Sequence, residues 1–489
     1  MRWDRHSIWS VLRASGATSG STALSILFHF VGIMLIARLV EKEVFGAYIL
    51  ILAVVQGVKV FAGFGLDLTL THHLAGEWQP SRAALFMRVL WLRLLGLMLV
   101  SVSLLAVAEW LSLLDVRLRD HLGYLLAIAF VGSGRELLLA ALQGMLEFRH
   151  YAYSMVLPAA LRLICVTLLF AVGLGDLVAL LRVELAVLVA SLIFMLCMPP
   201  IRQMLDHSRT NRDLTLRLLY FSGPLYLNSI IYFLGNRLNA FLLAGMSNSV
   251  QLANYGAAWQ IPDGCSRVYN AFMAAYFPFA SRTFTSDDPQ DVTRLAEVTL
   301  ATTALANMLL FLFASFFGAE ILIILFGAQY ASASLTFALL IAVYGLQSLV
   351  SVMGFTLVAA GHPGVTARIN IAGTILLLAG GLSAIPKFGA AGAALALVIS
   401  TIFVLMLNWR ALRARNLDVA SSTFLIPLAL AVVAVILGRG LLTDSTMLQA
   451  LVLLVYVVSC GVAVPELRAS GRFLLREARV LFSLPRRGS

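Results

Sequence analysis

Stretches of about twenty apolar residues recur from one end of the chain to the other, separated by short polar segments. A helix of that length crosses the hydrocarbon core of a bilayer, because each residue advances the helix by about 1.5 Å. The pattern therefore predicts an all-α membrane protein with about fourteen transmembrane helices. The predicted spans are residues 20–38, 46–66, 84–107, 121–144, 153–173, 178–198, 217–243, 250–279, 294–317, 330–360, 365–385, 389–409, 422–441 and 447–465.

Composition agrees with this pattern. Of the 489 residues, 61% are hydrophobic and 12% are charged, whereas soluble domains are about half apolar and about a quarter charged. No polar segment is long enough to fold as a separate catalytic domain, so a membrane-anchored enzyme is disfavoured. The four cysteines lack metal-ligand spacing and are interpreted as small hydrophobic residues, and we expect neither a metal nor a cofactor.

The net charge of +11 has two ordinary sources in a membrane protein. Loops rich in Lys and Arg hold the cytoplasmic side, and basic residues contact anionic lipid heads. With the N-terminus placed inside, the basic residues of the connecting segments fall on that side about three times as often as on the other. This bias predicts that both termini are cytoplasmic, and no nucleic-acid partner is expected.

The connecting segments divide the chain into two predicted lobes. The longest hydrophilic connection falls near the midpoint, and the two halves open alike, with Phe45-Gly46-Ala47-Tyr48 in one and Ala253-Asn254-Tyr255 in the other. The basic tail has arginines at helical spacing, which predicts an amphipathic helix on the inner leaflet. The predicted parts are a cytoplasmic N-terminal segment 1–16, an N-terminal lobe 17–200, a linker 201–215, a C-terminal lobe 216–415, two additional spans in 416–465 and the tail 466–489.

Charged residues inside the predicted spans are the main candidates for function. A charge in mid-bilayer costs at least about 2.5–3.5 kcal/mol, so those that persist usually face a partner or water. Asp263 and Arg267 are four residues apart and are expected to pair, whereas Arg182 and Glu184 do not share a helix face. The full set is His29, Lys59, Arg93, Arg135, Glu136, Arg162, Arg182, Glu184, Arg237, Asp263 and Arg267.

Basic residues outnumber acidic ones in this set, so positive charge remains after any pairing. A wet cavity lined with Lys and Arg would attract phosphate or diphosphate, for which arginine offers bidentate contacts. Lys59 and Arg237 are the preferred cavity residues. For Arg93, Arg162 and Arg182 the alternative remains open that they lie near span ends and extend to lipid phosphates.

Other polar and glycine-rich motifs point away from catalysis. No phosphate-cradling glycine loop or nucleophile elbow occurs. His72-His73 with Glu77 is not a zinc spacing and is interpreted as a polar loop at a span end. Gly63-Phe64-Gly65 and Gly389-Ala390-Ala391-Gly392 are interpreted as close-packing or hinge sites.

Three stretches carry a resemblance to a known family. The first runs from Ala37-Arg38-Leu39-Val40 through Phe45-Gly46-Ala47-Tyr48 to Gly63-Phe64-Gly65-Leu66, and the second joins Ala253-Asn254-Tyr255-Gly256 with Tyr276-Phe277-Pro278. The third, Ile385-Pro386-Lys387-Phe388-Gly389-Ala390-Ala391-Gly392-Ala393-Ala394 after Ala360-Gly361-His362, is the most specific. In these stretches the chain resembles bacterial polysaccharide and O-antigen flippases of the multidrug, oligosaccharidyl-lipid and polysaccharide exporter superfamily.

The resemblance implies two six-helix bundles around a central cavity, two extra C-terminal helices, and alternating access driven by an ion gradient or the membrane potential. It implies an undecaprenyl-diphosphate-linked oligosaccharide as cargo, the bacterial cytoplasmic membrane as location, and a polysaccharide polymerase and glycosyltransferases of the same pathway as partners beside membrane lipids. The predicted substrate contacts are Lys59, Arg237, Arg135, Arg93 and Arg267, and the predicted coupling or pairing carboxylates are Asp263, Glu136 and Glu184.

Several alternatives remain at this point. A lipid II flippase shares the anionic cargo, and a cation-coupled multidrug exporter shares the superfamily but usually places carboxylates in its cavity. A membrane-embedded sugar polymerase or ligase would need a larger outward loop, and a scaffold protein would not need unpaired arginines in the membrane.

Overall fold

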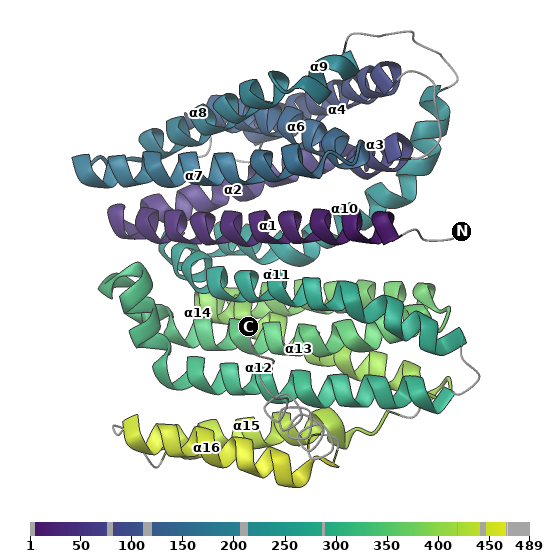
Figure 1. The fold of residues 1–489 in the computed structure, drawn as a ribbon. Helices are drawn as coiled ribbons and strands as arrows, with labels where there is room; N and C mark the ends of the chain where they lie inside the picture. The colour runs from purple at the N-terminus through teal and green to yellow at the C-terminus, as the bar shows by residue number, and fades with distance from the viewer. Residues whose placement is uncertain are drawn as a thin grey trace, which may run out of the picture. The chain divides into compact units, whose positions relative to one another are not determined.

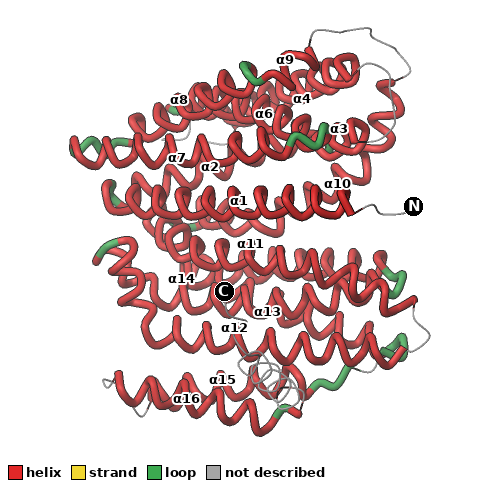
Figure 2. Tube along the Cα trace, viewed as in Figure 1, coloured by secondary structure: helices red, strands yellow, loops and turns green. Residues whose placement is uncertain are grey.

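A computed structural model describes residues 5–75, 82–110, 120–205, 214–285, 289–417, 419–440, 446–465 and 467. Within these residues the chain is helical and contains no strand (Figure 2). The prediction of an all-α fold is therefore confirmed. Residues 111–119 of the predicted loop between the third and fourth spans lie outside the described residues, as does the predicted amphipathic tail apart from Leu467.

Contacts divide the chain into two compact units, Met1–Gly256 and Ala257–Ser489. The helices of the first unit are α1 Arg5–Leu39, α2 Lys42–Gly63, α3 Leu66–Ala75, α4 Arg82–Trp110, α6 Leu122–Gly144, α7 Phe148–Val172, α8 Leu177–Leu196, α9 Pro199–Leu205 and α10 Leu214–Met246, followed by the start of α11 Ser249–Thr285 (Figure 1). The second unit contains the rest of α11, then α12 Pro289–Phe326, a short 3-10 helix Ala328–Ala333, α13 Ser334–Ala359, α14 Pro363–Arg413, α15 Ser422–Gly440 and α16 Thr446–Ala463.

The predicted spans coincide with these helices. Counting only described residues, ten helices are long and apolar enough to cross a membrane, and α15 and α16 supply two shorter apolar segments. The protein is therefore a multi-pass membrane protein. The 51-residue helix α14 contains two predicted spans, 365–385 and 389–409, which fits a total of about fourteen.

The turn between the two halves of α14 explains the Ile-Pro-x-Phe-Gly motif. Gly389 has φ 54° and ψ −128°, a region open essentially to glycine alone. The Ser400 hydroxyl donates to the carbonyl of Gly373 at 2.7 Å, so the segment after Gly389 runs back along the segment before it. A Cβ on Gly392 would lie 2.3 Å from the carbonyl oxygen of Ala384, which keeps this position small.

The boundary between the units differs from the predicted linker at 201–215. α10, which was predicted to open the second lobe, packs on α2 and α3 of the first unit. The division therefore falls at Gly256, inside α11. A hydrophilic segment shows where the chain leaves the membrane, but it does not show which helices the next helix packs against. The division of the chain into six parts therefore remains a prediction.

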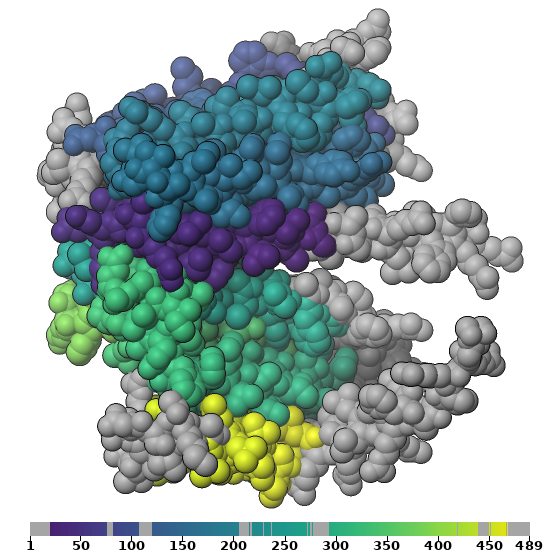
Figure 3. All heavy atoms as spheres, turned by 60° about the vertical axis from the view of Figure 1, so that its left-hand side comes forward, coloured from purple at the N-terminus to yellow at the C-terminus, as the bar shows by residue number. Residues whose placement is uncertain are grey.

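In the first unit, α1 and α7 run side by side, and α6 packs on α8, α3 and α2. The purple surface of α1 lies directly against the blue surface of later helices in the space-filling view (Figure 3). Leu66, Leu70, Leu138 and Met195 belong to one buried apolar cluster that joins α3, α6 and α8. This packing holds the polar groups described next in place between helices.

Candidate functional site

The site is built around a break between α2 and α3. Phe64, with φ 48° and ψ 24°, ends α2 in the left-handed region, and Gly65 follows with φ 68°. Two successive left-handed residues cannot continue a right-handed helix, so the chain restarts at Leu66. A Cβ on Gly65 would lie 2.8 Å from the Ser222 carbonyl oxygen and the Tyr226 nitrogen, so only glycine allows α10 to approach here.

The neighbouring helices satisfy the backbone that the break exposes. The last carbonyls of a helix have no partner within the helix, and the Tyr226 hydroxyl donates to one of these, that of Phe61, at 2.9 Å. On the other side the Thr69 hydroxyl donates to the Gly65 carbonyl at 2.9 Å. The predicted hinge at Gly63-Phe64-Gly65 is thus a fixed discontinuity, a feature that often marks binding sites in membrane transporters.

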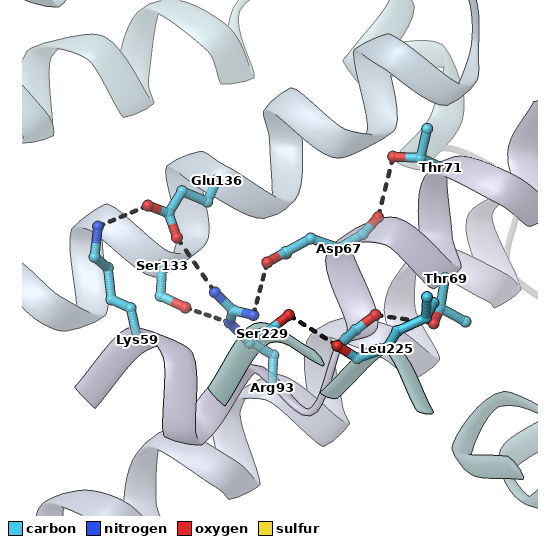
Figure 4. A network of polar contacts seen from close by, with 10 residues as sticks. Lys59, Asp67, Thr69, Thr71, Arg93, Ser133, Glu136, Leu225 and Ser229 are labelled. Atoms are coloured by element: carbon cyan, nitrogen blue, oxygen red, sulfur yellow. Dashed lines mark hydrogen bonds and ion pairs between the residues drawn. The ribbon is translucent and has the colours of Figure 1, made fainter. Parts of the chain in front are cut away.

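Four charged side chains meet beside the break (Figure 4). Lys59 Nζ lies 2.6 Å from Glu136 Oε1, and Arg93 lies 3.4 Å from Glu136 Oε2 and 3.0 Å from Asp67 Oδ2. The Arg93 Nε also donates to the Ser133 hydroxyl. The four charges come from α2, α3, α4 and α6, and they sum to zero.

The cations of this network are more buried than the carboxylates. The Arg93 side chain is 2% exposed and that of Lys59 14%, against 37% for Asp67 and 32% for Glu136. A Cβ on Gly63 would lie 2.6 Å from Arg93 NH1, so a glycine at the end of α2 provides the room for the guanidinium. Removing one partner of a buried ion pair typically costs about 3–5 kcal/mol, so these charges hold each other in place.

A second network lies between α1, α2, α7 and α8. Arg162 pairs with Glu184, Glu184 accepts a hydrogen bond from the Tyr48 hydroxyl, and Arg162 NH1 lies 2.8 Å from His29 Nδ1. The charges of this network also balance, because one guanidinium is paired with one carboxylate. The hypothesis that Arg93 and Arg162 extend to lipid phosphates is wrong, because both guanidinium groups bind carboxylates of neighbouring helices.

Arg135 has neutral partners. Its Nε donates to the Ser191 hydroxyl at 3.1 Å, and its NH2 donates to the Ser154 carbonyl at 2.9 Å. Pro158 follows four residues after Ser154 inside α7 and has no N–H to offer that carbonyl. Among the described residues no carboxylate lies within 4.0 Å of Arg135, so its charge is not balanced by direct contact.

Arg237 is the other predicted cavity residue without a carboxylate partner. It lies in the middle of α10, partly buried, and the described part of the chain places no ion-pair partner beside it. By contrast, the expected pair on α11 is confirmed, with Arg267 NH2 2.8 Å from Asp263 Oδ2 and both side chains substantially exposed. Arg182 is exposed and donates to the Tyr124 hydroxyl at 3.2 Å.

These contacts change the charge balance that the sequence predicted. Glu136 pairs with basic residues, as expected, and Lys59 is one of them, so the charge of Lys59 is balanced by direct contact. The surplus positive charge is on Arg135 and Arg237 instead. The role of any of these residues in substrate binding remains a prediction.

Asp67 is the member of the network that the sequence analysis missed. It falls just after the span predicted at 46–66, so it did not count as an intramembrane charge. The available signal was its position two residues after Gly65, because an acidic residue in the first turn of a helix is stabilised by the helix dipole. Recognising that the glycine pair breaks the helix would have made Asp67 a candidate.

The opposite end of α3 contains the two adjacent histidines. His72 stacks on Phe221 with ring centroids 4.8 Å apart, and the His73 ring lies 5.2 Å from Phe221. This segment is the last turn of a helix rather than the predicted loop. Burial, and then the neighbouring His72, lower the pKa of His73 below its ordinary value.

Comparison with known proteins now adds to this geometry. Residues 11–284 match the family described as polysaccharide biosynthesis protein. The chain belongs to that family. No curated protein sequence matches this polysaccharide biosynthesis protein. In the described residues, no group of three or more His, Cys, Asp or Glu side chains could hold a metal ion.

Solved structures share the fold of this polysaccharide biosynthesis protein. The lipid II flippase MurJ in an inward closed conformation has a TM-score of 0.65 at 12% identity, covering 92% of this chain and 98% of its own. An inward-facing multidrug resistance transporter of the MATE family in the MOP superfamily has a TM-score of 0.66 at 15% identity, covering 81% and 96%. A MOP superfamily transporter from Pyrococcus furiosus has a TM-score of 0.54 at 12% identity, covering 83% and 96%.

These similarities establish the MurJ- and MATE-like fold. The resemblance that the sequence motifs indicated is therefore confirmed at the level of the polysaccharide biosynthesis family. Among the proteins that share the fold, one is described as a lipid II flippase and the others as transporters.

Proposed function

We propose that this protein is a flippase that moves an undecaprenyl-diphosphate-linked oligosaccharide from the inner to the outer leaflet of the bacterial cytoplasmic membrane. The observation that carries the proposal is the match of residues 11–284 to the polysaccharide biosynthesis family, on a chain whose fold is shared with a lipid II flippase over 92% of its length. A polysaccharide precursor on a lipid carrier is the cargo that joins these two findings.

The positive charge left unbalanced within the first unit supports an anionic cargo. Arg237 and Arg135 have no carboxylate within 4.0 Å in the described part of the chain, whereas Lys59, Arg93 and Arg162 do. A guanidinium in a low-dielectric setting favours a diphosphate, with which it forms paired, charge-assisted hydrogen bonds. We therefore propose Arg237 as the leading diphosphate contact and Arg135 as the second.

Lys59, Arg93 and Arg267 are less suited to this role in their present arrangement. Each already has a carboxylate within 3.5 Å. An incoming diphosphate would have to displace that carboxylate and leave it without its counter-ion, which opposes binding. In the proposed function the two carboxylates beside the helix break act as counter-ions for the protein's own cations. We also propose that both termini face the cytoplasm.

The test is a leaflet-exchange assay with the purified full-length protein in liposomes. A fluorescent undecaprenyl-diphosphate oligosaccharide is incorporated in both leaflets, and a quencher that cannot cross the membrane reports how fast the protected pool becomes accessible. We expect wild-type protein to accelerate exchange. Arg237→Ala should lower the rate by about ten- to a hundredfold, the range given by loss of a hydrogen bond to a charged group.

Two comparisons make the result specific. Arg182→Ala removes an exposed guanidinium that donates to the Tyr124 hydroxyl, and this variant should exchange the lipid at the wild-type rate. The same carrier lipid bearing a neutral head should not be moved faster than in empty liposomes. Exchange that is equal for the neutral lipid, or transport of a cationic drug without exchange of the diphosphate lipid, would refute the proposal.

A further inference from the structure

Asp67 occupies an unusual position for an acidic residue in a membrane protein. It lies in the first turn of α3, directly after the helix break, and one of its oxygens, Oδ2, is 3.0 Å from Arg93 NH1. The other oxygen, Oδ1, is buried and has no hydrogen-bond partner among the described residues. A carboxylate oxygen that is removed from water without a donor is poorly satisfied in its ionised form. Asp67 is therefore a group that can gain from binding a proton.

The network around Asp67 can accommodate the loss of its charge. Arg93 contacts two carboxylates, Asp67 and Glu136, so it keeps a counter-ion when Asp67 becomes neutral. Glu136 cannot be neutralised in the same way, because it is the carboxylate bound to Lys59. Protonation of Glu136 would leave the Lys59 ammonium unpaired within the membrane, which is unfavourable. The two carboxylates therefore differ in role.

The carboxylates and the cations of the network also differ in their exposure. The carboxylates of the network are about one-third exposed, whereas the Arg93 guanidinium is nearly fully buried. A proton can therefore reach Asp67 without disturbing the packing around Arg93. Figure 4 shows Asp67 at the end of the network and Glu136 between Lys59 and Arg93.

From this geometry we propose that Asp67 is the proton-binding site through which this flippase uses a proton gradient. The inference rests on the proposed function for its transport step, but proton binding itself can be tested without any lipid substrate. One proton adds to Asp67, and the net charge of the four-residue network changes from zero to +1. No bond other than the O–H bond forms or breaks.

Charged groups on three neighbouring helices act on Asp67. Arg93 lies on α4, Glu136 on α6 and Lys59 on α2, while on α10 the phenol of Tyr226 donates to the backbone of Phe61. Proton uptake weakens the link between α3 and α4, since the Asp67–Arg93 ion pair is the charged contact that joins them. Proton binding can in this way alter how the broken helix is held.

The first experiment measures proton binding in the full-length protein without substrate. Infrared difference spectra recorded between neutral and acidic pH show the carbonyl band of any carboxylic acid that forms. We expect a titrating band in the wild-type protein that shifts when aspartate is isotopically labelled and is absent from Asp67→Asn. Glu147→Gln removes a surface carboxylate at the start of α7 and should leave the band unchanged.

The second experiment measures coupling in the leaflet-exchange assay. For one proton per cycle, a gradient of one pH unit can change the distribution of the lipid by at most about tenfold. We expect the wild-type distribution to follow the gradient and that of Asp67→Asn to be independent of it. Asp67→Glu, which retains a titratable group, should recover the dependence at least in part.

The outcomes separate this inference from the proposed function. A titrating band that does not move on aspartate labelling, or that persists in Asp67→Asn, overturns the assignment whether or not any lipid is moved. Where Asp67→Asn does not fold, Asp67→Glu decides the matter, because a band that belongs to residue 67 should no longer shift on aspartate labelling in that variant. Failure of wild-type exchange with an intact Asp67 band would instead refute the proposed cargo and leave the proton site standing.

Discussion

Arg135 NH2 donates to the carbonyl of Ser154 at 2.9 Å, and this hydrogen bond takes the place of one that α7 cannot make for itself. In an unbroken helix the N–H four residues later would bind that carbonyl, but residue 158 is proline. Arg135 on α6 therefore stabilises a neighbouring helix at its weakest point. The same contact leaves the charge of the guanidinium unbalanced, so one residue serves both the fold and the proposed anion site.

The structural part of this role predicts a coupling between Arg135 and Pro158. Arg135→Ala leaves a buried carbonyl without a donor and should lower the free energy of unfolding by about 1–3 kcal/mol. In a Pro158→Ala background, α7 supplies the missing N–H, so the same substitution should cost less, with a coupling of about 0.5–3 kcal/mol. Reversible unfolding in mixed micelles gives the free energy of unfolding of the wild-type protein, the two single variants and the double variant. Equal costs in both backgrounds would mean that Arg135 does not act on the α7 carbonyl.

The Phe45-Gly46-Ala47-Tyr48 motif predicts a position that admits only glycine. A Cβ on Gly46 would lie 2.0 Å from the Ser249 carbonyl oxygen at the start of α11. Because backbone cannot move aside as a side chain can, Gly46→Ala should destabilise the protein by about 1–3 kcal/mol. Gly235→Ala is the matched control, since nothing lies within 4 Å of its added methyl and alanine favours the helix. Thermal unfolding should show a loss for the first variant and no loss for the second.

The Arg162–Glu184 pair predicts that one substitution is worse than two. Glu184→Gln leaves the Arg162 guanidinium buried without an anion and should cost about 3–5 kcal/mol. Replacing both residues by methionine removes the unpaired charge and should cost clearly less. Tyr48→Phe removes only the hydroxyl group that donates to Glu184 and should lower the free energy of unfolding by about 1 kcal/mol. A double variant less stable than Glu184→Gln would contradict this account of the network.

The histidines at the end of α3 predict how stability depends on pH. His73 has a pKa lowered from the model-peptide value of 6.5, and it lies in the last turn of α3, outside the apolar spans. As the pH falls through about 6.5, the unfolded state binds a proton that the folded state still excludes. Stability that is present at neutral pH should therefore decline on acidification, until the pH reaches the lower folded-state value.

Unfolding measured between neutral and mildly acidic pH tests this sign. His73→Gln should flatten the dependence, because glutamine does not titrate. His362→Gln, at the exposed start of α14, removes a histidine elsewhere and should leave the slope of the wild-type curve in place. A slope that is unchanged in His73→Gln would assign the pH dependence to other groups.

Much of the fold followed from the sequence because hydropathy is a local property. Most predicted spans follow single helices of the structure, although the span 46–66 runs across the break at Phe64 and Gly65 and the span 330–360 begins in the short 3-10 helix. Even the division of the 51-residue helix α14 was predicted correctly between 385 and 389. The glycine motifs were likewise recognised as packing or hinge positions. The location of the boundary between the two units was not recognised, because the contacts of α10 with α2 and α3 depend on tertiary packing, which no local pattern records.

By itself the sequence determined that this chain is a bundle of membrane-spanning helices, because burying apolar residues in lipid depends only on how they follow one another. Only the tertiary structure decided which charges are balanced. Lys59 and Glu136 are 77 residues apart, yet they bind at 2.6 Å, and the break at Phe64 and Gly65 brings Asp67 to Arg93. These ion pairs form between different helices, so the charge of each residue is read from the sequence but its partner is set by packing.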